Sequence, residues 1–159
     1  MAKKQDQTSP AAERAAAIKI RRAKSSDGGQ IAELCGQLGY PAKPAAIAQR
    51  LRRIKPANQH AVLVAESPER KVLGWLHVSV SPLLEVELRA EVNGLIVDGE
   101  ERSRGTGALL LRAAEQWARS RGCKSMSVRS NVIRERAHRF YLRHGYEHYK
   151  TQKAFRKPL

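Results

Sequence analysis

Two glycines at the start of a predicted helix are the residues whose types and spacing point most directly to chemistry. Gly105 and Gly107 follow an apolar strand and open an amphipathic helix. A helix start presents unpaired backbone N–H groups and the positive end of the helix dipole, and glycine lets a ligand approach the backbone closely. We therefore expect phosphate groups to bind here. A tight turn that holds no ligand is the alternative.

Two better-known glycine loops do not fit this segment. A dinucleotide-binding fingerprint needs a third glycine three residues after Gly107, where the sequence has Leu110. A Walker A loop needs Gly-Lys-Ser or Gly-Lys-Thr after the first glycine, and the segment has neither. The spacing thus argues against both kinds of nucleotide site.

The same segment resembles a motif of a known family. The pattern Arg102-x-x-Gly105-x-Gly107 is similar to the pyrophosphate-binding motif Gln/Arg-x-x-Gly-x-Gly/Ala of the GNAT superfamily of acetyl-CoA-dependent N-acetyltransferases. A second block, residues 130–146, resembles the family's Asn-x-x-(Arg)-Ala-x-x-Phe-Tyr-x-x-x-Gly-Tyr/Phe stretch. The blocks stand in the family's order. The resemblance spans residues 18–155 and is specific only after Glu91.

The resemblance implies acetyl-CoA as the acetyl donor and assigns residues to it. The loop that would hold the pyrophosphate consists of Arg102, Ser103, Arg104, Gly105, Thr106 and Gly107. The pantetheine arm would pair with the backbone of Leu95, Ile96 and Val97, next to a bulge near Gly94 and a splay from the following strand. The second block would add Asn131, Arg134, Ala137 and Phe140. Asn131 has a second role open to it, the capping of the next helix.

The resemblance also suggests the groups that move protons. An amine with a pKa near 10 is mostly protonated at neutral pH, so a base or a water chain must accept a proton before the amine can attack a thioester. Glu91 matches the position of that base, and alternation places Glu91, Asn93 and Leu95 on one strand face. A solvated glutamate at the strand edge is the alternative. Glu85 and Glu87 are weaker candidates that would supply negative charge. Tyr141 matches the family's general acid, with a packed core tyrosine as the alternative.

Hydrophobic periodicity predicts the elements that position these residues. Strands are expected at 18–23, 60–66, 72–80, 86–97, 124–129 and around 148–155, and helices at about 27–38, 44–54, 105–120 and 133–144. The first helix would be capped by Ser26 or Asp27. The third would bury Leu109, Leu110, Ala113, Ala114 and Trp117. The order predicts an α/β fold, a mixed and mostly antiparallel sheet with helices on both faces, in one domain over 18–159 after a flexible tail, 1–17.

Composition limits the remaining function classes. Thirty Lys and Arg against fifteen Asp and Glu give a formal charge of +15, which attracts polyanions and leaves a basic nucleic-acid-binding module as an alternative function. No aromatic-rich RNA-binding strand or zinc-finger spacing supports it. A non-catalytic acyl-CoA sensor is the other alternative.

Cysteine usage and hydropathy bear on the setting of the protein. Cys35 and Cys123 form no disulfide framework or zinc motif, which favours a reducing, cytoplasmic setting. No stretch has the length of a membrane span, so no membrane partner is expected. No partner group beside Cys123 supports a covalent acyl-enzyme, so we expect direct attack in a ternary complex. The sequence leaves the amine acceptor, small or protein, and a homodimer open.

Overall fold

A five-stranded sheet lies at the centre of the first of two structural units. The computed structural model describes residues 17–54 and 59–159, and its units are Met1–Val128 and Arg129–Leu159. The strands follow the order β1-β2-β3-β4-β5, with bounds Lys19–Arg22, His60–Glu66, Val72–Val80, Arg89–Val97 and Ser125–Val128. The first four strands are antiparallel and β5 is parallel to β4. The predicted mixed sheet is therefore confirmed.

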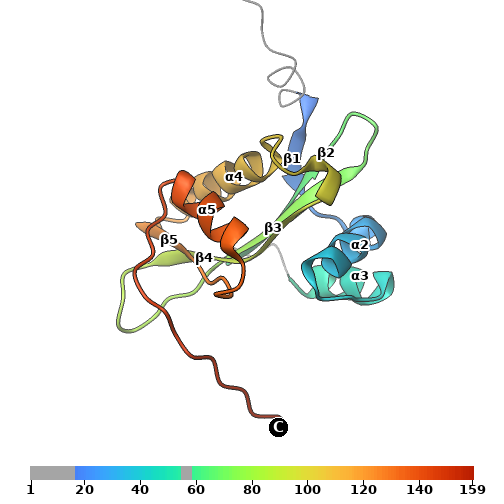
Figure 1. Cartoon of the computed structure of the whole chain (residues 1–159). Helices are drawn as coiled ribbons and strands as arrows, with labels where there is room; N and C mark the ends of the chain where they lie inside the picture. Colours follow the sequence, from blue (N-terminus) through green and yellow to red (C-terminus); the bar gives the residue numbers. More distant parts are fainter. Residues whose placement is uncertain (1–16, 55–58) are drawn as a thin grey trace, which may run out of the picture. The chain divides into compact units, whose positions relative to one another are not determined.

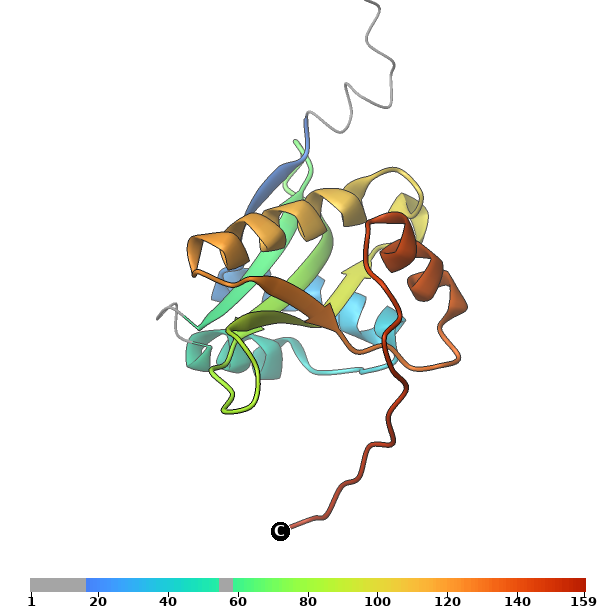
Figure 2. The same cartoon turned by 90° about the vertical axis from the view of Figure 1, so that its left-hand side faces the viewer.

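Helices cover both faces of this sheet (Figures 1 and 2). On one face lie α2 (Gly28–Leu38) and α3 (Pro44–Arg53), preceded by the short helix η1 (Ser25–Asp27). They form a buried aliphatic cluster with the sheet through Ile31, Ile47 and Ile96. On the other face lies α4 (Thr106–Ser120), preceded by η2 (Gly99–Glu101).

Two predictions about the helices need correction. In α4 the buried residues are Thr106, Leu110, Leu111, Ala114 and Ala118, whereas Leu109, Ala113 and Trp117 are half-buried. The apolar stripe thus faces the sheet about one residue later than predicted. Asp27 precedes α2, but its carboxylate makes no cap bond to the helix and instead accepts from Arg21 and the Lys24 amide. An ion pair with the neighbouring strand has replaced the cap.

Strand β4 begins at Arg89, three residues later than the predicted start at Val86. Its pairing with β3 ends at Ala90 opposite Val80, so residues 81–88 form a loop with no strand partner. Pro82 lacks the N–H that a strand needs, and Leu84 is fully exposed. The apolar residues of this loop resemble a strand in sequence without packing as one.

The second unit contains α5 (Glu135–Arg143) and the chain that follows it. The helix begins two residues after the predicted Ile133. The strand expected around 148–155 is absent from the described residues, since residues 147–159 are all exposed and make no ladder of hydrogen bonds. A suitable pattern of residue types does not form a strand unless the edge of another strand lies beside it to accept its hydrogen bonds. Of the predicted tail 1–17, residues 1–16 lie outside the described residues.

Candidate functional site

A β-bulge in β4 sets the directions of the site residues. Val92 pairs with Val78 of β3, but Gly94, two residues later, pairs with His77, so Asn93 is the extra residue. The bulge predicted near Gly94 is therefore present. A Cβ at Gly94 would lie 2.8 Å from the ring of Trp75, which explains the glycine beside the bulge.

The bulge changes which residues share a face. Glu91 lies opposite Ser79, and the Asn93 amide donates to the Ser79 hydroxyl at 2.8 Å, so these side chains share the face covered by α2 and α3. Leu95 lies opposite Leu76 and faces the α4 side. The predicted grouping of Glu91 with Asn93 is confirmed, whereas the inclusion of Leu95 was wrong, because the extra residue shifts the alternation by one.

The strands β4 and β5 part after a short ladder. Their parallel pairing covers Arg89–Val92 and Ser125–Val128 and ends there. Leu95, Ile96 and Val97 pair with β3 on one side, and within the described ranges 17–54 and 59–159 no strand pairs with their other side. An unpaired strand edge of this kind offers N–H and C=O groups to an extended amide-containing ligand.

The loop between β4 and α4 has the backbone that a phosphate site needs. Ser103 and Gly105 have φ angles of 65° and 90°, and Gly105 precedes α4 without any side-chain cap. A left-handed non-glycine residue is uncommon and often marks a functional turn. The amide groups of the first helical turn therefore face outward from a glycine at the positive end of the helix dipole.

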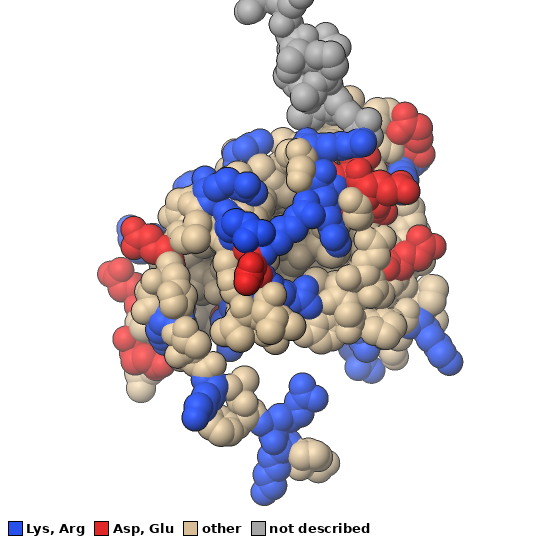
Figure 3. All heavy atoms as spheres, in the orientation of Figure 1, with Lys and Arg blue, Asp and Glu red and all other residues tan. Residues whose placement is uncertain are grey.

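Side chains around this loop also fit an anionic ligand. Arg104 lies 3.4 Å from the buried carboxylate of Glu101, and the Arg102 side chain donates to the Val97 carbonyl at 3.4 Å. The hydroxyl of Thr106 is fully buried and has no hydrogen-bond partner among the described residues. Basic side chains are numerous on the face drawn in Figure 3. The residues present thus fit the pyrophosphate of acetyl-CoA.

The other predicted residues belong to the second unit. The side chain of Asn131 accepts from the Ile133 amide at 3.2 Å and its carbonyl accepts from the Arg134 amide at 2.9 Å, so Asn131 caps the turn before α5. Arg134 and Ala137 lie at the start of that helix. The ring of Tyr141 contacts Phe140 edge-on, with ring centres 5.3 Å apart. Burial raises the pKa of the Tyr141 phenol to about 12.

Comparison with known proteins places this arrangement in a family. Residues 30–146 match the model of the acetyltransferase (GNAT) family. The chain belongs to the GNAT acetyltransferase family. Acetyl-CoA is accordingly its acetyl donor.

Individual relatives of this GNAT chain have different names. It is 32% identical over 108 residues to an aminoglycoside N(6')-acetyltransferase type 1 of Klebsiella aerogenes, covering 66% of this chain and 71% of the relative. It is 39% identical over 66 residues to an aminoalkylphosphonate N-acetyltransferase of Salmonella typhimurium, covering 40% of this chain and 43% of the relative. The structure of AAC(6')-Iy in complex with a bisubstrate analog superposes with a TM-score of 0.77 at 18% identity, over 89% of this chain and 99% of that one, which shows the shared fold.

The GNAT sheet also carries polar residues that the sequence reasoning missed. His60 Nδ1 and His77 Nε2 are 3.1 Å apart on adjacent strands, and Ser79 is buried between His60 and Glu91 in the strand register. Burial first and the charge of His60 second lower the pKa of His77 to about 4. The sequence signal for this pair is the presence of two histidines in two strands that otherwise consist mostly of apolar residues.

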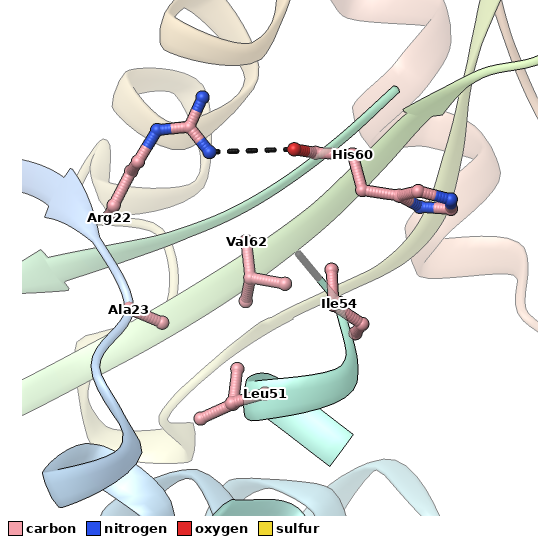
Figure 4. A pocket seen from close by; sticks show the side chains of 6 residues that line it. All are labelled: Arg22, Ala23, Leu51, Ile54, His60 and Val62. Carbon is pink, nitrogen blue, oxygen red and sulfur yellow. Dashed lines mark hydrogen bonds between the residues drawn. The ribbon is translucent and has the colours of Figure 1, made fainter. Parts of the chain in front are cut away.

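A small cavity of about 220 Å³ lies beside His60 in this GNAT fold (Figure 4). It lies at the junction of β1, β2 and the end of α3, and its walls are Arg22, Ala23, Leu51, Ile54, His60 and Val62. The Arg22 guanidinium donates to the His60 carbonyl at 3.4 Å. None of the predicted site residues lines this cavity, so it is separate from the acetyl-CoA loop.

The described residues offer neither a metal cluster nor a membrane-spanning helix. Across 17–54 and 59–159, His, Cys, Asp and Glu form no cluster of three or more that could hold a metal ion. Within the same ranges, the helices are too short or too polar to cross a membrane.

Proposed function

We propose that this chain transfers the acetyl group of acetyl-CoA to a primary amine of a small acceptor by direct attack in a ternary complex. The observation that carries the proposal is that three features follow one another in the chain. They are the carboxylate of Glu91, the unpaired strand edge at 95–97 and the uncapped glycine loop before α4. These supply in turn a proton acceptor, partners for the pantetheine amides and donors for the pyrophosphate.

The proton steps follow from ordinary acidities. The attacking nitrogen must lose a proton while its bond to the acetyl carbon forms and the carbon–sulfur bond breaks. Glu91 accepts that proton, directly or through water. A thiol of pKa about 8.5 is a good leaving group, and Tyr141, with its raised pKa of about 12, is a weaker acid than the thiol. Tyr141 therefore acts by donating a hydrogen bond to the leaving sulfur more than by giving up its proton.

Charge near β4 supports a cationic acceptor. Glu85 and Glu87 lie in the exposed loop before β4, and Glu91 follows within the strand, so three carboxylates lie within seven residues of a chain that is otherwise basic. Such a cluster favours a polycationic amine by complementary charge. The relative from Klebsiella aerogenes, named as an aminoglycoside acetyltransferase, supports acceptors of that kind.

A turnover screen tests the proposed reaction. Thiol release from acetyl-CoA would be measured with aminoglycosides, polyamines, aminoalkylphosphonates, amino acids and a lysine-containing peptide. We expect release with the polycationic amines and little with the phosphonates. Binding of acetyl-CoA without release for any amine would favour the acyl-CoA sensor, and binding of nucleic acid without binding of acetyl-CoA would favour the nucleic-acid module.

Glu91→Gln tests the base, with Glu87→Gln as the matched control in the neighbouring loop. The Glu91 variant should lower kcat/KM at neutral pH, where the acceptor is largely protonated, and the deficit should shrink as the pH rises because more amine arrives neutral. The control should keep the shape of the wild-type pH profile, because Glu87 contributes charge that attracts the acceptor, a change in KM, and accepts no proton. Superimposable profiles for wild type and the Glu91 variant would move the base to another group or to water.

A further inference from the structure

Two glutamine side chains of α2 reach the backbone at places where the strand ladder ends. Gln30 Oε1 accepts from the Val72 amide at 2.7 Å, and Gln37 Oε1 accepts from the Gly99 amide at 3.0 Å. Val72 begins β3, and Gly99 begins η2, just after β4 ends at Val97. The spacing of the glutamines is close to two helical turns, so they project from the same side of α2. Each bond ties this helix to the end of a strand.

The turn that follows β4 has a hydrogen-bond acceptor for each amide of residues 98–101. Asp98 donates to the Leu73 carbonyl at 2.8 Å and so continues the ladder with β3. Glu100 donates to the Asp98 carboxylate at 3.0 Å, and Glu101 donates to the Asp98 carbonyl at 2.9 Å. These acceptors belong to the neighbouring strand or to the turn itself. The remaining amide, that of Gly99, has its acceptor on α2, so this bond fixes the turn against the helix layer.

The donor loop, residues 102–107, begins where this turn ends. Its far end is anchored because Thr106, the first residue of α4, is fully buried. Its near end follows Glu101, whose buried carboxylate lies 3.4 Å from Arg104. The residues between these ends, 102–105, are all exposed. A loop that is held at both ends has less conformational freedom to lose when a ligand binds, so an anchor at its start raises the affinity for that ligand.

We propose that Gln37 is a positioning residue for the acetyl donor. By accepting from the Gly99 amide, it holds the start of the donor loop where the loop can bind the pyrophosphate. The bond also joins the helix layer that covers Glu91 to the loop that holds the donor. Gln37 and Gly99 are both exposed, so water can replace the lost acceptor, and its removal frees the loop without unfolding the chain. This inference rests on the donor loop of the proposed function.

Gln37→Met in the full-length chain tests this role, because methionine keeps the length of the side chain and removes the amide oxygen. The variant should raise both the dissociation constant of acetyl-CoA, measured by calorimetry, and its KM by about two- to fivefold, with kcat at saturating donor unchanged. Gln30→Met is the matched control on the same helix. It removes the shorter, partly buried bond to Val72, so it should lower the Tm and leave the dissociation constant of acetyl-CoA unchanged.

Gln37→Glu separates the loss of the acceptor from other effects of substitution, because a carboxylate oxygen can accept from the same amide. In about 0.3 M salt, which screens the added charge, its dissociation constant for acetyl-CoA should be close to that of wild type. Hydrogen exchange over residues 98–105 should be faster in Gln37→Met than in either of these proteins. Wild-type donor affinity in Gln37→Met, or an equal loss in Gln37→Glu, overturns the positioning role. Donor binding that survives Gly107→Glu would instead overturn the donor loop itself, a result distinct from these.

Discussion

Substitution of Gly74 by alanine tests the close contact between β3 and β4 that holds the predicted pantetheine edge. Gly74 lies opposite Val97, and a Cβ at position 74 would lie 2.6 Å from the Ile96 carbonyl oxygen and 3.2 Å from the Val97 Cα. No rotamer change relieves a clash with backbone. Alanine must therefore push residues 96 and 97 away from β3.

The size of the effect follows from two opposing contributions. Overpacking of a filled interior costs about 1–3 kcal/mol, and replacing glycine by alanine returns about 0.4–1 kcal/mol by restricting the unfolded chain. The net loss should be about 1–2 kcal/mol for Gly74→Ala, which corresponds to a Tm lower by about 2–8 °C in a domain of this size. Because the displaced backbone is the proposed partner of the donor amides, the stabilisation by acetyl-CoA should also decrease.

Gly36→Ala provides the matched control for this prediction. Gly36 is an exposed residue within α2, and a Cβ there meets nothing within 4 Å. The same change should raise stability by about 0.5–1 kcal/mol, since glycine disfavours a helix interior. Urea unfolding followed by circular dichroism measures both variants. A Gly74→Ala chain as stable as the Gly36→Ala chain would refute the packing argument.

Three further predictions concern the donor loop, the acid and the ion cluster near α2. Gly107→Glu should abolish the rise in Tm caused by acetyl-CoA, because it sets bulk and negative charge against the pyrophosphate; an unchanged shift would place the donor elsewhere. Tyr141→Phe should keep donor affinity and lower kcat, measured under conditions where chemistry limits turnover; an unchanged kcat would make Tyr141 a packing residue. Burial raises the pKa of Asp27, but hydrogen bonds from Arg21 outweigh this effect, so the pKa of Asp27 lies below its ordinary value. The hydrogen bond from Arg21 also lowers the pKa of Glu66. A carboxyl group whose pKa is lowered by folding stabilises the fold at pH values above its ordinary pKa. This stabilisation is lost as the pH falls through the pKa of the group in the folded state. The free energy of unfolding of Arg21→Met should therefore depend less on pH than that of wild type between about pH 6 and 3. Urea unfolding at several pH values measures it, and an equal pH dependence in both proteins would contradict the prediction.

Local pattern predicted the elements better than it predicted their directions. The hairpin of β2 and β3 has the predicted bounds, because its alternating valines face a helix layer on either side. The bulge at Asn93 was expected nearby, but its effect on Leu95 was not drawn from the sequence, since one extra residue reverses a period of two. The terminal strand failed for another reason. A strand forms only when the edge of another strand is available for pairing, and the residues of the segment itself do not show whether it is.

The histidine pair shows the same limit in the site. Neither His60 nor His77 has a motif around it, and only the register of the hairpin brings their rings to 3.1 Å. The glycine loop could be predicted because its chemistry depends on neighbours in sequence, namely two glycines and the helix that follows. Sites formed across strands require the pairing to be known first.

The bulge in β4 also has a consequence for how the chain can change over evolution. Before it, Glu91 faces the layer of α2 and α3, and after it, Leu95 faces the layer of α4. Alternate residues of this strand pack in the two layers, with Ile96 in the α2 and α3 cluster and Leu95 on the α4 side, and the bulge shifts which residues face each layer. Substitutions in α2 and α3 can reshape the surroundings of Glu91 without repacking α4, so new acceptors can be explored while the donor loop at the start of α4 stays intact.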